Sequence, residues 1–121
     1  ADAVFTNDEH RLSMYQRVNE HQVKLWAEFL AKMQATNEGE RTLLENSMIL
    51  LTSSLMDGNA HDSRQLPVVL AGNGGGTIQG GRFHDLSKDP NRKLCRLHIA
   101  LMDRMGVHTA HFGDAENALA I

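Results

Sequence analysis

The stretch "SMILLTSSLMDGNAHDSRQLPVVLAG", residues 47–72, decides the fold because it holds two apolar runs on either side of a polar turn. Neither run, 47–52 nor 67–71, alternates apolar with polar residues, which is the pattern of a strand covered on both faces. Covered strands are typical of parallel sheets, so we expect two neighbouring, buried strands with a central, parallel arrangement. Pro67 fits the first residue of a strand, where its missing N–H costs little.

An amphipathic helix is predicted before this pair, over about 8–35. Its apolar residues recur at helical intervals: Leu12, Tyr15, Val18, Leu25, Phe29 and Met33, with Trp26 and Leu30 widening the stripe. "TNDE" at 6–9 predicts a capping box in which Thr6 and Glu9 exchange hydrogen bonds. Asn37 and Gly39 predict the helix end, because both tolerate the left-handed conformation found there.

A second helix is predicted after the pair, over 91–105. Asp89 is placed as its N-cap, Pro90 at its first position and Gly106 as its terminator. Helices alternating with short buried strands indicate an α/β fold, here part of an α/β/α layered sheet with both helices packed on it. Two strands make a poor independent sheet, so we expect an extensive interface to another copy, another chain or the rest of a parent protein.

Composition bounds the remaining possibilities. A chain of 121 residues fits one domain, and 12 Lys and Arg against 15 Asp and Glu, without a basic stripe, argue against nucleic acid as a partner. The single Cys95 excludes an internal disulfide. No apolar stretch approaches the roughly 20 residues that span a bilayer, and "ADAVFTNDEH" lacks the features of a signal peptide.

Polar side chains follow the first strand, namely Ser53, Ser54, Asp57, Asn59 and His61. Ligands gather at the carboxyl ends of strands in open α/β sheets. Asp57 and His61 can bind a divalent ion such as Zn or Ca, with Asn59 as an oxygen donor, although the spacing matches no closed structural zinc set. The alternative is that "MDGN" only turns the chain and "HDS" is a solvated loop.

Glycines gather after the second strand: Gly72, Gly74, Gly75, Gly76, Gly80 and Gly81. Their amides can approach an anion, but no Gly-Lys-Ser/Thr follows and no helix opens behind them. A turn or hairpin is the favoured interpretation. His84, just after "GGR", can reach back towards Asp57 and His61, or stay solvated.

The pieces "LPVVLAG", "NAHD" and "DRMGV" followed by "FGD" resemble the C-terminal portion of the HXXSHH-motif proteins, an uncharacterised family of secreted bacterial proteins. The resemblance runs from about Thr6 to Leu119 and covers only the last part of a family member. One departure matters: Ala3, Val4 and Phe5 stand where the family motif has Ser, His and His. The resemblance implies that residues 1–121 are a single domain or a C-terminal fragment of a larger domain, secreted or periplasmic.

That family in turn resembles the alkaline phosphatase and sulfatase superfamily, whose α/β/α sheets carry metal-binding Asp and His after a strand. The similarity implies that Asp57 and His61 match a metal-ligand neighbourhood and His84 a later site histidine. Two functions follow as hypotheses. One is metal-dependent hydrolysis of phosphate or sulfate esters, with weak or absent activity in this chain. The alternative is a non-catalytic subunit or interaction module of a bacterial envelope protein complex.

Overall fold

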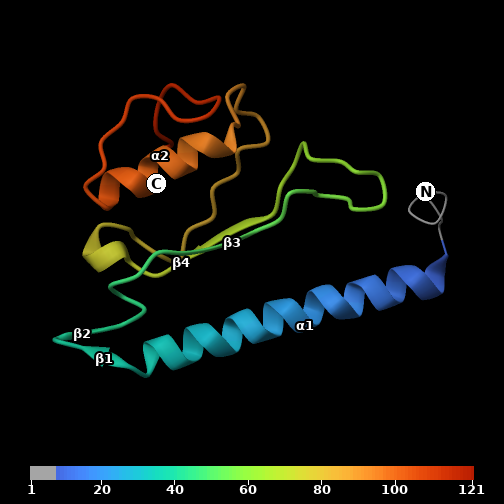
Figure 1. The fold of residues 1–121 in the computed structure, drawn as a ribbon, viewed down its shortest axis with the longest axis horizontal. Coiled ribbons are helices and arrows are strands. Elements are labelled where there is room, and N and C mark those ends of the chain that lie inside the picture. Colours follow the sequence, from blue (N-terminus) through green and yellow to red (C-terminus); the bar gives the residue numbers. More distant parts are fainter. Residues whose placement is uncertain (1–7) are drawn as a thin grey trace.

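The computed structural model describes residues 8–121, which form two helices and two small antiparallel sheets (Figure 1). In chain order the elements are α1 (Glu9–Gln34), β1 (Asn37–Glu38), β2 (Arg41–Thr42), β3 (Ile49–Thr52), β4 (Val68–Ala71), a 3₁₀ turn (Gly74–Gly76) and α2 (Leu94–Arg104). Figure 1 shows the β3–β4 pair between α1 and α2. The predicted α/β fold, with a long N-terminal helix and a C-terminal helix, is confirmed.

The first helix begins at a side-chain cap. The Asp8 carboxylate accepts hydrogen bonds from the backbone N–H groups of His10 at 3.0 Å and Arg11 at 3.4 Å. An aspartate at this position satisfies donors that the first turn leaves unpaired. Thr6 of the predicted capping box lies outside the described residues. The helix ends with Ala35 as its C-cap, so the predicted span of about 8–35 is confirmed.

The apolar stripe of α1 is present but little covered. The helix has no buried residue, and Trp26, Leu30 and Met33 on one edge of the stripe are half-buried. The exposed apolar residues of α1 are Leu12, Met14, Tyr15, Val18, Val23, Leu25 and Phe29. An amphipathic helix in water derives most of its stability from burying its apolar face. Within residues 8–121, that burial is incomplete.

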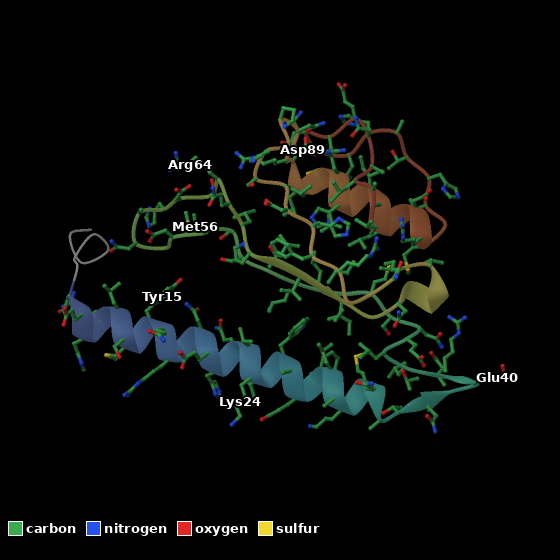
Figure 2. The ribbon with its side chains drawn as sticks, turned by 180° about the vertical axis from the view of Figure 1, so that it is seen from behind. Tyr15, Lys24, Glu40, Met56, Arg64 and Asp89 are labelled. Carbon is green, nitrogen blue, oxygen red and sulfur yellow. The ribbon has the colours of Figure 1, made fainter. Side chains whose placement is uncertain are left out.

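A small hairpin follows α1, and it was not predicted from the sequence. Strands β1 and β2 pair Asn37 with Thr42 and Glu38 with Arg41. The sequence places Gly39 at the helix end, but its φ of +65° serves the hairpin turn instead, with Glu40 at the tip (Figure 2). Two-residue hairpin turns require this left-handed conformation, which glycine adopts without strain.

Strands β3 and β4 are neighbours in one sheet, as predicted, but they run antiparallel. Leu50 faces Leu70 across the pair, and residues 53–67 return the chain as a long hairpin (Figure 1). The prediction of a parallel pair is therefore wrong, because parallel neighbours need a crossover connection and these residues form none. Cover on both faces is also incomplete, since Val69 is 48% exposed.

The second helix starts later than the sequence predicts. Lys93, not Asp89, is the N-cap of α2, and Pro90 lies outside the helix. Asp89 instead accepts a hydrogen bond from the Asn91 N–H at 2.8 Å and forms an ion pair with Arg96 at 3.3 Å, close to the start of α2 in Figure 2.

The end of α2 is as predicted. Gly106 adopts a φ of +80°, its N–H donates to the Asp103 carbonyl, and the Val107 N–H donates to the Met102 carbonyl. These two bonds form a Schellman motif, which pairs the last carbonyls of the helix.

The buried core gathers around α2. Its residues are Ile78, Leu97, Ile99, Ala100 and Ala115. All five follow β4 in the chain, so the C-terminal part holds most of the apolar packing. No helix among residues 8–121 is long and apolar enough to cross a membrane.

Candidate functional site

Residues 56–62 form the tip of the β3–β4 hairpin. Asp57 and Asp62 face each other as an isolated antiparallel bridge, with the Asp62 N–H donating to the Asp57 carbonyl at 3.0 Å. This tip projects beyond the ends of the two strands (Figure 1). The sequence interpretation of "MDGNAHD" as a turn is therefore confirmed in its geometry.

The Asp57 carboxylate is occupied by its own loop. Its Oδ1 accepts hydrogen bonds from the backbone N–H groups of Asn59 at 2.9 Å and Ala60 at 3.1 Å. This is an Asx turn, in which the side chain organises the backbone that follows it. His61 is exposed and has a φ of +52°, an uncommon conformation for a residue with a side chain. One oxygen of the predicted metal ligand thus already serves a structural role.

Asp62 and Arg64 form the main charged pair of the tip, which the sequence interpretation overlooked. The Arg64 guanidinium donates to both carboxylate oxygens, at 3.0 and 2.7 Å, and the Arg64 backbone N–H donates at 2.9 Å. These hydrogen bonds from the Arg64 side chain, and then from its backbone, lower the pKa of Asp62 to about 2. The spacing of Asp62 and Arg64 in "DSR" could have indicated this ion pair, since side chains two residues apart in a turn can come into contact.

The hairpin tip also approaches the first helix. A Cβ on Gly58 would lie 2.9 Å from the Tyr15 hydroxyl oxygen, so a side chain at this position would displace the tyrosine ring. Figure 2 shows Tyr15 on α1 beneath the loop that carries Met56 and Arg64. Gly58 therefore permits close approach between two segments that are distant in sequence.

The three glycines of the 3₁₀ turn have no amides to offer an anion. The N–H groups of Gly74, Gly75 and Gly76 donate to the backbone carbonyls of Ser47, Glu45 and Asn73. The turn interpretation is thus supported for these three glycines, whose amides are not open to an anion. The turn joins β4 to residues leading towards α2 and not to another strand, so of the predicted turn or hairpin it is the turn that forms.

Thr42 and Glu45 cap each other in the segment whose carbonyls accept hydrogen bonds from Gly74 and Gly75. The Thr42 N–H donates to the Glu45 carboxylate at 2.6 Å, and the Glu45 N–H donates to the Thr42 hydroxyl at 3.2 Å. The backbone hydrogen bond from Thr42, followed by the one from its side chain, lowers the pKa of Glu45. "TLLE" at 42–45 is a capping-box pattern that the sequence interpretation missed.

His84 lies exposed in the segment between the 3₁₀ turn and α2. Among residues 8–121, no group of three or more His, Cys, Asp or Glu side chains is placed to hold a metal ion. The structure does not bring Asp57, His61 and His84 together as such a group. That they bind Zn or Ca stays a prediction.

Comparison with known proteins gave no match to a family model, to a curated protein or to a solved structure.

Proposed function

We propose that this chain is a non-catalytic interaction module that contributes one layer to a larger α/β body. The remainder of a parent chain or another protein subunit covers α1 in that body. The resemblance to the HXXSHH-motif proteins supports a secreted or periplasmic setting and a position in the C-terminal part of such a body.

The observation that carries this proposal is the surface that the chain leaves in water. Its accessible surface is 8926 Å². A folded monomer of 13.4 kDa exposes about 6,500 Å² by the usual scaling of surface with mass. The chain therefore exposes more surface than a compact monomer of its mass, as a protein does when part of its surface belongs to an interface. The exposed apolar residues of α1 contribute to this surface, and an exposed apolar face of this kind marks a contact with another protein.

Native mass spectrometry of the protein purified from its source tests the proposal. We expect a mass well above 13.4 kDa, either because the chain is longer or because another subunit is bound, since the apolar face of α1 has to be buried by other protein. Leu25→Lys places a charge on that face and should reduce the recovery of the larger body at least several-fold. Lys24→Gln, on the polar face one residue away, is the matched control and should leave recovery unchanged.

Hydrogen exchange adds an internal reference. In the isolated chain the amides of α1 should exchange much faster than those of α2, since α1 has no buried residue and α2 has three. A 13.4 kDa monomer from the source, with α1 protected as strongly as α2, would contradict the proposal.

Metal-dependent hydrolysis of phosphate or sulfate esters is the second candidate. It is supported by the superfamily resemblance around "NAHD" and by the presence of a carboxylate and an imidazole on the 56–62 tip. Asp57 and His61 would hold a divalent ion, and the chemistry supplied there would be polarisation of the ester oxygen and activation of water. The structure does not place His84 with them as a third ligand. Asp57 has one carboxylate oxygen outside the Asx turn to offer.

Calorimetry with zinc chloride and calcium chloride separates the two candidates. For an interaction module, His61→Ala should change the heat of binding no more than His111→Ala does, because both histidines are exposed. Tight binding by the wild type that His61→Ala abolishes and His111→Ala retains would favour the hydrolase.

A further inference from the structure

The sheet formed by β3 and β4 is open along its edges. Within residues 8–121 it holds these two strands alone, which face each other as four residue pairs from Ile49–Ala71 to Thr52–Val68. Facing residues in an antiparallel pair alternate between those that exchange backbone hydrogen bonds and those whose N–H and C=O groups point away from the partner strand. Every second residue of each strand therefore directs its backbone groups outward.

These outward backbone groups have no partner in the described chain. Apart from the bonds within the pair, the N–H and C=O groups of 49–52 and 68–71 form no hydrogen bond with any residue of 8–121. A row of donors and acceptors at strand spacing is matched by one kind of ligand, namely another extended polypeptide backbone. The free edge thus specifies the chemistry of its partner, which an apolar surface alone does not.

The edge of β4 is the more accessible of the two. Val68 is 39% exposed and Val69 is 48% exposed. In contrast, residues 49–51 of β3 are half-buried, and the groove that contains Ile49 is also lined by Phe29 of α1. An incoming strand therefore reaches β4 more easily than β3.

Strand β4 lacks most of the features that protect the edge of a sheet. Soluble proteins protect such edges with charged residues, prolines, bulges or very short strands. Residues 68–71 carry no charge, they pair with β3 without a bulge, and Pro67 precedes them, so all four keep their N–H groups. Only the length of four residues limits what a partner can bind. An uncharged apolar edge is typical of a strand inside a sheet.

We propose that an extended apolar strand of the covering protein pairs with the free edge of β4 and makes β4 an interior strand of a larger sheet. The proposal rests on the proposed function, because it names how the rest of the α/β body joins this chain. The backbone hydrogen bonds align the incoming strand along β4. Since β4 is short, the apolar face of α1 supplies most of the buried surface.

Residue-resolved amide hydrogen exchange tests this pairing, in the isolated chain and in the larger body purified from the source. In the isolated chain, alternate amides of 68–71 should exchange fast. In the larger body all four should be protected, with the outward amides slowed at least a hundredfold, because they gain acceptors from the incoming strand.

Three results of the exchange experiment would overturn the proposal. If α1 becomes protected in the larger body while the outward amides of β4 stay fast, the strand pairing fails and the proposed function stands. If the source yields a 13.4 kDa monomer, both fail. If the larger body contains only copies of this chain, paired through β4, the partner is a second copy and not a separate covering strand.

Two proline variants test the pairing without reference to exchange rates. Val69 and Leu70 are neighbours, so one directs its N–H towards β3 and the other directs it outward. Proline removes that N–H. The outward variant should keep the urea midpoint of the isolated chain near that of the wild type and reduce recovery of the larger body at least several-fold. The inward variant should lower the midpoint as well. Unchanged recovery with the outward proline would contradict the proposal.

Discussion

Replacing Gly72 by alanine is expected to lower the free energy of unfolding by about 3–5 kcal/mol. Gly72 has a φ of +94°, where a Cβ is strained, and that Cβ would lie 2.0 Å from the Ser47 carbonyl oxygen and 2.8 Å from the Leu44 carbonyl oxygen. Both are backbone atoms, so no side-chain rotation relieves the clash. The Ser47 carbonyl also accepts from the Gly74 N–H, and the shift would break this bond between the two turns.

Gly39→Ala is the matched control for Gly72→Ala. Gly39 also has a positive φ, +65°, but a Cβ there would meet no atom within 4 Å. Its expected cost is the conformational strain alone, about 1–2 kcal/mol. Urea unfolding followed by circular dichroism measures both. Equal losses at the two positions would show that the close approach to Ser47 contributes nothing.

Ile99→Ala is expected to lower the free energy of unfolding by about 2–5 kcal/mol. Ile99 is 3% exposed and lies in α2 beside Ala100, which is fully buried. Removing its outer carbons leaves a cavity in the part of the chain where the buried residues gather. The neighbours can close this space only in part, and the lost contacts are not replaced by water.

Leu25→Ala provides the contrast on the first helix. Leu25 is 51% exposed in the described chain, so its truncation should cost the isolated chain about 0.5 kcal/mol or less. The same substitution should cost more in the larger body, where a partner covers this face. Chemical unfolding of the two variants in parallel measures the difference. A loss for Leu25→Ala as large as for Ile99→Ala in the isolated chain would contradict the location of the core in the C-terminal part.

Local signals in the sequence predicted both helices. The apolar residues of α1, from Leu12 to Met33, recur with the helical period, and that period is a property of the chain rather than of its surroundings. Gly106 predicted the end of α2 for a similar reason, since glycine alone adopts its φ of +80° at no cost. The start of α2 was predicted wrongly, because the Asp89 carboxylate pairs with Arg96, seven residues away, and does not cap the helix.

The two apolar runs predicted that 47–52 and 67–71 pair, but not in which direction. An uninterrupted apolar run reports burial on both faces, and that property is common to parallel and some antiparallel strands. The direction depends on whether residues 53–67 cross over or turn back, and the Asp57–Asp62 bridge turns them back. The sequence pattern does not show whether this bridge or a crossover forms, because the hydrogen bonds of the Asp57–Asp62 bridge exist only once the tip has folded.

The sequence by itself determined the elements that depend on neighbouring residues: the amphipathic period of α1, the turn at "MDGNAHD" and the glycine positions. Only the tertiary structure decided what these elements meet. It placed Tyr15 against Gly58, committed one oxygen of Asp57 to its own loop and left Arg104 Nε without an acceptor. It also left the apolar face of α1 in water. The physical reason is that periodicity and turn chemistry act over a few residues, whereas burial and hydrogen-bond pairing depend on segments that only folding, or a partner, brings together.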